Sequence, residues 1–328
     1  MRSILVLGCG SIGERHLRCL QQTGRAQVSA CDAKAALAAR VGAHYGVPHF
    51  SSLDDALAAQ MYEGIVICTP AHTHLALARA ALRHGAGLLI EKPLSTGLAE
   101  VEEARAEMAS ADVFIGVAYV YHFMPWMQAA RAILRGGDLG RPLQVSVVSG
   151  QHFPTFRPAY REIYYARHEM GGGAIQDALT HLANAVEWLV GPATRLFCEA
   201  AHQALEGVEV EDTVCLVARH GEVLASYAMN QFQAPNETTL LVHCERGSVK
   251  LEAHAQRCGV LRHGATDWQW QACPLERDAI FTAQAHAFLD SLEGKATDLC
   301  TFDEAVQTLK FNLAALASMR TGSSVTLA

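Results

Sequence analysis

Short apolar runs alternate with longer amphipathic stretches along the first third of the chain. Between the runs, apolar residues recur at helical spacing at 12–24, 34–46, 52–59, 74–85 and 98–111. The runs are rich in β-branched or small apolar residues, as buried strands are, and lie at 3–9, 26–32, 47–50, 64–70, 86–93 and 113–119. Strands that alternate with helices predict a doubly wound parallel α/β sheet that ends near residue 121.

The pattern changes after Pro125. Helices are expected at 125–140, 173–190, 279–292 and 303–319. Short apolar runs that follow one another across tight polar turns predict strands at 143–153, 194–203, 213–220, 222–232, 238–245 and 247–253. We therefore expect two domains, a parallel α/β domain at 1–121 and an α+β domain with a predominantly antiparallel sheet at 122–328.

Composition agrees with this division and excludes several classes of protein. A chain of 328 residues, half of them hydrophobic, is too long for one ordinary core. The net charge of −7 without a long basic run argues against a nucleic-acid partner. The apolar run at 1–13 is too short for a signal peptide or a membrane span. Ten cysteines without a CxxC pair are expected to be reduced core residues of a cytoplasmic protein.

A glycine-rich turn joins the first predicted strand to the first predicted helix. Gly8, Gly10 and Gly13 form GCGSIG, and Asp32 ends the second predicted strand. In this context glycines allow a tight turn, close approach of a pyrophosphate and close packing of the helix. The acidic residue suits ribose hydroxyls, so NAD is expected rather than NADP, with a turn that binds nothing as the alternative. The expected contacts include Ser11 and Ile12.

Two further strand ends are candidates for cofactor contacts. Cys68, Thr69 and Pro70 follow the fourth strand and could line the nicotinamide ribose together with His74, although an ordinary helix start explains them equally well. His72 and His74 lack a third ligand at matching spacing, so no metal is expected.

Glu91 and Lys92 end the fifth strand, and ligands bind at the carboxyl ends of parallel strands. A lysine at this place could stabilise an alkoxide. The alternative is a solvated Lys–Glu pair.

Residues 170–184 read MGGGAIQDALTHLAN and place two ionisable groups in an apolar helix. Asp177 and His181 are four residues apart, about one helical turn, and would share a face. They could be a buried structural pair, or an orienting carboxylate and a general acid or base. The glycines before them leave space for a ligand to approach.

The order of these motifs, GCGSIG, TPxxxH, EKP and GGGxxxDxxxH, resembles the glucose-fructose oxidoreductase, inositol dehydrogenase and MocA (Gfo/Idh/MocA) family over nearly the whole chain. The resemblance implies a Rossmann domain followed by an open-faced antiparallel domain. It also implies oxidation or reduction of a secondary alcohol on a sugar, sugar acid or cyclitol with NAD or NADP.

By position, Lys92, Asp177 and His181 correspond to the family's catalytic residues. The resemblance leaves open whether Lys92 or His181 carries the proton, and whether Asp177 orients His181 or touches a hydroxyl. Residues 118–125 depart from the family pattern at Val120 and His122, which puts substrate contacts there in doubt.

Substrate contacts are expected from residues rich in hydroxyl and guanidinium groups. The segment 153–170 concentrates arginine and tyrosine directly before the Asp–His helix, a composition that suits a sugar with a carboxylate or phosphate. An ordinary surface loop is the alternative. The candidates for substrate binding are Tyr119, Arg157, Tyr160 and Arg161. The resemblance adds Asn184, which lies where many members of the family carry a polar residue near the substrate.

Three other activities compete with an NAD(P)-dependent dehydrogenase. They are a glycoside hydrolase that works by transient oxidation with retained NAD, a ligand sensor without catalysis, and a reductase of imines or double bonds. Retention of Lys92, Asp177 and His181 favours the dehydrogenase. The open sheet of the family further implies a homodimer or homotetramer through the uncovered face.

Overall fold

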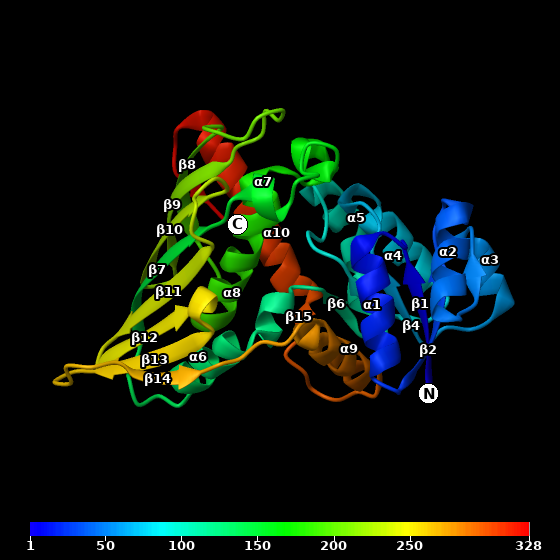
Figure 1. Cartoon of the computed structure of the whole chain (residues 1–328), viewed down its shortest axis with the longest axis horizontal. Coiled ribbons are helices and arrows are strands. Elements are labelled where there is room, and N and C mark those ends of the chain that lie inside the picture. The colour runs from blue at the N-terminus through cyan, green and yellow to red at the C-terminus, as the bar shows by residue number, and fades with distance from the viewer. Residues whose placement is uncertain (328) are drawn as a thin grey trace. The chain divides into compact units, whose positions relative to one another are not determined.

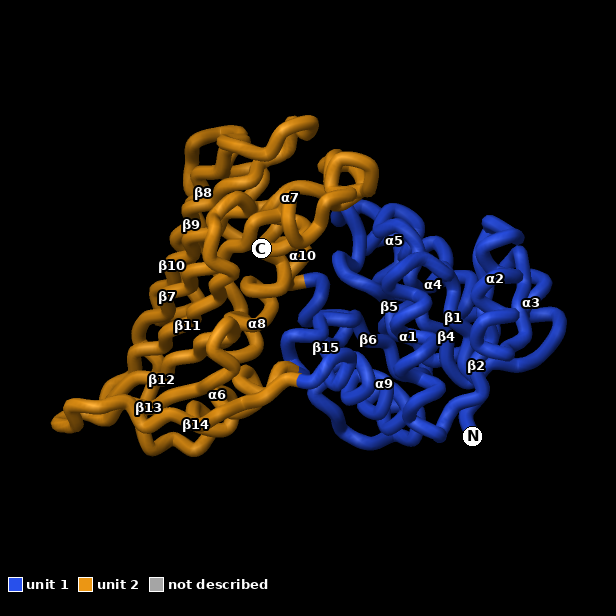
Figure 2. The backbone as a smooth tube through the Cα atoms, viewed as in Figure 1, with its two compact units in different colours: residues 1–123, 276–306 blue, residues 124–275, 307–328 orange. Residues whose placement is uncertain are grey.

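The computed structural model describes residues 1–327, which form two compact units (Figure 2). Unit 1 comprises Met1–Phe123 and Glu276–Val306. Unit 2 comprises Met124–Leu275 and the chain from Gln307 onward. Each unit is built around its own sheet, and each is described separately below.

The sheet of unit 1 has the parallel order expected of a doubly wound fold. Its strands follow one another as β15-β6-β5-β4-β1-β2-β3, and only β15 runs antiparallel to its neighbour β6. Every residue of β4 and β5 is buried, as in parallel strands covered on both faces. The strands are β1 Arg2–Leu7, β2 Ala26–Cys31, β3 His49–Phe50, β4 Gly64–Ile67, β5 Gly87–Ile90, β6 Ile115–Val117 and β15 Cys300–Thr301.

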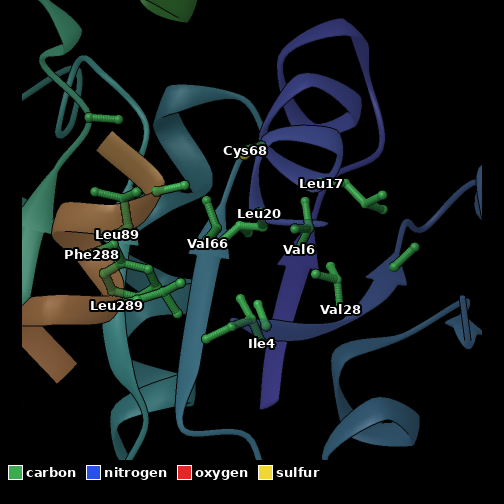
Figure 3. Close-up of a cluster of buried hydrophobic side chains, with 14 of the residues drawn as sticks. Ile4, Val6, Leu17, Leu20, Val28, Val66, Cys68, Leu89, Phe288 and Leu289 are labelled. Atoms are coloured by element: carbon green, nitrogen blue, oxygen red, sulfur yellow. The ribbon is translucent and has the colours of Figure 1, made fainter. Parts of the chain in front are cut away.

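Helices cover this sheet (Figure 1). The apolar side chains of its central strands are buried. α1 packs beside α9, and α4 packs beside α5. Leu17 and Leu20 of α1 meet Phe288 and Leu289 of α9 in one buried cluster with Ile4 and its neighbours (Figure 3). The helices are α1 Ser11–Gln22, α2 Ala35–Tyr45, α3 Leu53–Ala59, α4 His74–Leu82, α5 Leu98–Ser110 and α9 Ala279–Leu292.

The return of residues 276–306 to unit 1 differs from the expected assignment of the whole range 122–328 to one domain. The physical reason is packing. Phe288 and Leu289 of α9 are fully buried in the core of unit 1, and Cys300 of β15 pairs with Val117 of β6. A pattern of apolar positions identifies α9 as a buried helix but does not say which sheet it covers.

The sheet of unit 2 is mostly antiparallel, as predicted. Its order is β14-β13-β12-β11-β7-β10-β9-β8-β16, and the exception is the parallel pair β10 and β7. Two of its hairpin strands, β13 and β14, were not predicted. The strands are β7 Pro142–Gly150, β8 Arg195–Ala201, β9 Thr213–His220, β10 Val223–Asn230, β11 Glu237–Cys244, β12 Gly247–Glu252, β13 Arg257–Arg262, β14 Gln269–Ala272 and β16 Val325–Thr326.

Helices cover one face of this sheet. α6 packs on β12 and β13, α8 packs on β7, and Phe311 of α10 contacts Tyr227 of β10. The opposite face leaves apolar side chains in solvent, among them Val148, Val217 and Leu224, of which Val217 is 56% exposed. The helices are α6 Pro125–Arg135, α7 Phe153–Phe156, α8 Thr180–Val190 and α10 Phe302–Thr321, which begins in unit 1.

Nine of the ten cysteines are buried, and all ten are free thiols; Cys215 is the exposed one. Burial raises the pKa of Cys9 to about 11 and that of Cys198 to about 12, so these thiols are neutral and unreactive near neutral pH. Within residues 1–327, the helices are all too short or too polar to cross a membrane.

Candidate functional site

The glycine-rich turn between β1 and α1 is required by the fold at two of its three glycines. Gly8 has a φ of +98°, and a Cβ there would lie 2.7 Å from the Cys68 carbonyl. A Cβ on Gly13 would lie 1.7 Å from the carbonyl oxygen of Gly8. The first and third glycines therefore permit the tight turn and the close packing of α1 on β1.

Gly10 differs from these two glycines. Apart from its own neighbours along the chain, no described atom lies within 4 Å of a Cβ placed on it, and its φ of −66° is open to any residue. The backbone therefore faces empty space directly before the N-terminus of α1, where the amides of Ser11 and Ile12 begin the helix. A pyrophosphate needs this kind of cradle, so the residues present fit a dinucleotide cofactor.

A hollow of about 400 Å³ opens beside the first turns of α1. Four arginines and one glutamate contribute to its wall. Arg40 is paired with Glu14, and Arg15 and Arg18 are paired with Asp278. The lining residues are Ser11, Glu14, Arg15, Arg18, Arg40 and Arg277.

Asp32 lies directly after β2 and is bonded to the glycine-rich turn. Its carboxylate accepts hydrogen bonds from the backbone amides of Cys9 (2.7 Å) and Lys34 (2.8 Å). The carboxylate thus belongs to the cradle itself. Its predicted contact with the ribose of NAD stays a prediction.

The TP turn after β4 is held by a buried histidine. Nε2 of His74 lies 2.8 Å from the carbonyl oxygen of Thr69, and Nδ1 lies 3.0 Å from that of Pro93. Burial lowers the pKa of His74. These contacts connect the segments that follow β4 and β5 through the His74 ring. The predicted contact of His74 with the cofactor stays a prediction. Cys68 is buried, and Pro70 is exposed at the turn.

Lys92 comes directly after Glu91, at the carboxyl end of β5. The Glu91 carboxylate accepts a hydrogen bond from the Lys92 amide (3.0 Å), and its other oxygen lies 2.7 Å from Nε2 of His16. Glu91 was predicted as a cofactor contact, whereas its described bonds are within the protein. His16 was not singled out from the sequence, because a histidine inside an amphipathic helix gives no local signal of its partner.

In unit 2, Asp177 lies in a π-helical turn, Ile175–Leu179, rather than in the regular helix predicted at 173–190. Such turns are frequent at functional sites. The buried Asp177 carboxylate accepts hydrogen bonds from Nη1 of Arg157 (2.9 Å) and from the hydroxyl of Tyr164 (2.6 Å). Arg157, predicted to bind substrate, is therefore also a partner of Asp177, and its substrate contact stays a prediction.

Glu211 holds the start of this turn by hydrogen bonds, and nothing in the local pattern of residues marks it. Its backbone carbonyl and its side chain accept the amides of Ala174 (2.9 Å) and Ile175 (2.8 Å). Gly173 has a φ of +88°, and a Cβ there would lie 2.6 Å from the Glu211 carboxylate. His168 also bonds this carboxylate at 2.5 Å, and the hydrogen bond raises the pKa of His168.

Most of the remaining predicted residues of unit 2 are hydrogen-bonded within the chain. His181 is partly buried on α8, and Asn184 on the same helix donates to the Thr308 hydroxyl of α10 (3.0 Å). The Tyr160 hydroxyl and the Arg161 guanidinium both donate to the carbonyl oxygen of Glu206, at 2.8 Å each. These bonds account for Tyr160 and Arg161 without a ligand, and their substrate contacts, like that of Asn184, stay predictions.

Tyr119, the candidate of unit 1 for substrate binding, lies just after β6 and is buried, with its amide bonded to Val117. Unit 1 thus brings together the glycine-rich turn, Asp32, the TP turn and Lys92, and unit 2 brings together Arg157 and Asp177. The residues of unit 1 lie at the carboxyl ends of strands, and Asp177 of unit 2 lies directly before α8.

Two family models match the chain. Residues 2–119 match the GFO/IDH/MocA oxidoreductase family with an NAD-binding Rossmann fold, and residues 127–250 match the C-terminal domain of the same family. The likeness first indicated by the motifs therefore extends to both parts of the chain.

Named relatives are distant. The chain is 26% identical over 256 residues to D-apiose dehydrogenase from Paraburkholderia graminis, across 76% of this chain and 67% of that protein. It is 26% identical over 193 residues to inositol 2-dehydrogenase from Burkholderia multivorans, across 57% of this chain and 53% of that protein, about half of its length.

A solved structure of levoglucosan dehydrogenase in complex with NADH and levoglucosan is similar in fold. It has a TM-score of 0.89 and 19% identity, and the alignment covers 99% of each chain. At this identity the likeness shows the shared fold.

Proposed function

This chain belongs to the Gfo/Idh/MocA family of NAD-dependent oxidoreductases, and from that premise we propose that it oxidises or reduces a secondary alcohol of a sugar, sugar acid or cyclitol. The names of its relatives, which include sugar and inositol dehydrogenases, support this substrate class. The proposed substrate is therefore a small molecule with several hydroxyl groups.

The cofactor would be held by the cradle of unit 1. The open side of Gly10 and the first amides of α1 suit the pyrophosphate, and the carboxylate of Asp32 suits ribose hydroxyls, which favours NAD over NADP. When bound, NAD supplies a nicotinamide ring that accepts a hydride from the alcohol carbon. All other tasks fall to the residues of the chain.

Two residues would handle the alcohol oxygen and its proton. The Lys92 ammonium stabilises the negative charge that develops on the oxygen, and the His181 imidazole accepts the proton as a general base. The resemblance also allows these roles to be exchanged, with Lys92 carrying the proton.

Asp177 would bind a substrate hydroxyl or orient His181. Its carboxylate is buried and is held from two sides by Arg157 and Tyr164, so its orientation is set before any ligand binds. Preorganised polar groups of this kind lose little free energy to reorganisation during the reaction.

The observation that carries the proposal is the retention of three ionisable groups at constrained positions. Lys92 directly follows β5, Asp177 lies in the π-helical turn and His181 follows it on α8. A protein that only sensed a ligand would need neither a general base nor a group that stabilises an alkoxide. This combination supports catalysis over sensing.

Single substitutions test the two roles. Lys92→Ala and His181→Ala should each lower kcat by about 10²–10⁴, while the Kd for NAD, measured by calorimetry, stays close to that of the unaltered protein. Lys295→Ala and His263→Ala, which change the same residue types at exposed positions, are the controls. Near-normal turnover in either test variant would remove that residue from the mechanism.

We also propose a homodimer or homotetramer in the cytoplasm. The uncovered face of the unit 2 sheet exposes Val148, Val217 and Leu224, and a second copy of the chain would bury them. Ten free thiols suit a reducing compartment.

A further inference from the structure

Two ionisable side chains lie buried next to the peptide of Lys92. His16 is 1% exposed and Glu91 is 7% exposed. Nε2 of His16 and Oε1 of Glu91 are 2.7 Å apart, and Oε2 of Glu91 accepts the backbone amide of Lys92 at 3.0 Å. Neither His16 nor the Glu91 carboxylate has a task in the mechanism proposed above.

The pair connects two elements with separate tasks. His16 lies on α1, the helix that begins at the glycine-rich turn, and Glu91 follows β5. The His16 ring is itself fixed, because it meets the ring of Phe281 on α9 edge to face, with centroids 5.8 Å apart. One hydrogen bond thus joins the cofactor-binding helix to the residue that precedes Lys92.

A buried carboxylate is costly unless polar groups surround it. Glu91 keeps its charge because the hydrogen bond from His16, the proximity of Lys92 and the Lys92 amide outweigh the effect of burial, and together they hold its pKa below the ordinary value. Both carboxylate oxygens are thereby committed. Rotation of Glu91 would break a bond in a place where water cannot replace it.

The backbone one residue beyond Lys92 is held as well. The carbonyl oxygen of Pro93 lies 3.0 Å from Nδ1 of the buried His74. The backbone is therefore held on both sides of the Lys92 side chain. Glu91 binds the Lys92 amide, and His74 contacts the carbonyl oxygen of Pro93. Such a frame sets where the lysine side chain begins, and a misplacement of about 1 Å in a reacting group can cost about 10²-fold in rate.

We propose that His16 is a positioning residue for Lys92, which it holds through the carboxylate of Glu91 in a fixed place relative to α1. The consequence for catalysis rests on the role of Lys92 in the proposed function, whereas the effect on the Lys92 backbone does not. The two can therefore be tested separately.

The first test measures amide hydrogen exchange by mass spectrometry in the segment 90–95. His16→Leu removes the donor, and we expect faster exchange there, because the Lys92 amide loses its fixed acceptor. His16→Gln keeps a donor of similar reach and should restore protection. Leu17→Ala, a core substitution on the same helix, controls for general loss of stability.

An unchanged exchange rate in His16→Leu, or an equal increase in Leu17→Ala, would overturn the proposal. So would a His16→Gln variant that exchanges as fast as His16→Leu. Thermal unfolding of all three variants identifies any that fail to fold, and if His16→Leu is one of them, His16→Ala, which also removes the donor, takes its place.

The second test uses turnover with NAD and the best alcohol among myo-inositol, D-glucose, D-glucuronate and D-xylose. His16→Leu should lower kcat by about 10- to 100-fold with little change in the Kd for NAD. In a Lys92→Ala background it should lower kcat no further. A normal Lys92→Ala enzyme would refute the proposed function, whereas a normal His16→Leu enzyme beside an impaired Lys92→Ala enzyme would refute this inference alone.

Discussion

The Asp177 carboxylate shows how single residues of this chain depend on partners that sequence does not reveal. Asp177 itself could be selected from its spacing to His181 and from the glycines before it. Its hydrogen bonds to Arg157 and Tyr164 could not, because they depend on the path of the segment 153–170. Tyr160 and Arg161 from the same segment are instead bonded to Glu206.

This difference between two tyrosines gives a prediction. Tyr164→Phe should lower kcat by roughly ten- to a hundredfold, because it removes a hydrogen bond to a charged group, a bond that contributes about 1.5–3 kcal/mol. Tyr160→Phe, which removes a hydroxyl bonded only to the carbonyl of Glu206 and to Arg161, should leave kcat nearly unchanged. Steady-state kinetics of both variants measure kcat. A larger loss of kcat in Tyr160→Phe than in Tyr164→Phe would contradict the prediction.

At the scale of elements, the strands of unit 1 could be predicted because each is a buried apolar run between glycine or polar turns. The π-helical turn could not, because Glu211, which accepts the amide of Ile175 at its start, comes from another part of the chain. The parallel pairing of β10 with β7 could not be predicted either, because local periodicity does not determine the order of strands in a sheet.

The glycine-rich turn allows a matched pair of substitutions. Gly13→Ala should lower the free energy of unfolding by about 1–3 kcal/mol, because its Cβ would overlap the Gly8 carbonyl. Gly10→Ala should leave stability unchanged and weaken NAD binding by roughly ten- to a hundredfold, because its Cβ enters the cradle. Chemical denaturation and calorimetry separate the effects. Full NAD affinity in Gly10→Ala would place the pyrophosphate elsewhere.

The start of the π-helical turn should respond to pH through His168. The hydrogen bond to Glu211 raises the pKa of His168. Protonated His168 therefore stabilises the folded state below about pH 6.5, the ordinary pKa of histidine, and this contribution is lost as pH rises through the raised pKa. Relative to His168→Gln, the unaltered protein should therefore lose stability from about pH 6.5 upward.

Denaturant unfolding at several pH values measures this difference. His74 and His220, whose pKa values are lowered by burial, act in the opposite direction, but they are present in both proteins and cancel. An exposed histidine, His263→Gln, serves as the control. A stability difference that does not vary with pH would mean that the His168–Glu211 pair does not titrate in this range.

At the scale of the whole molecule, each unit has a layer architecture that follows from its apolar pattern, and the chain crosses from one unit to the other more than once. The sequence indicated the two sheets but not the return of 276–306, because Phe288 and Leu289 would suit the core of either unit. It indicated one uncovered sheet face only through the family resemblance.

The uncovered face allows a test of assembly. Val217→Glu places a charge at an exposed position of β9, and if a second copy covers this face the variant should have a smaller mass in solution than the unaltered protein. Met61→Glu, at a highly exposed position of unit 1, should keep the original mass. Light scattering measures both, and an unchanged mass for Val217→Glu would move the interface away from this part of the sheet.

We propose that this chain oxidises a polyol with NAD, and the formation of NADH is the first measurement to make. The purified protein is incubated with NAD and a panel of cyclitols, aldoses, uronic acids and glycosides while NADH absorbance is followed. We expect NADH to form with at least one free alcohol, and this signal to be lost in Lys92→Ala and His181→Ala. Cleavage of a glycoside without net NADH, by a protein that retains bound NAD, would contradict it and favour a hydrolase.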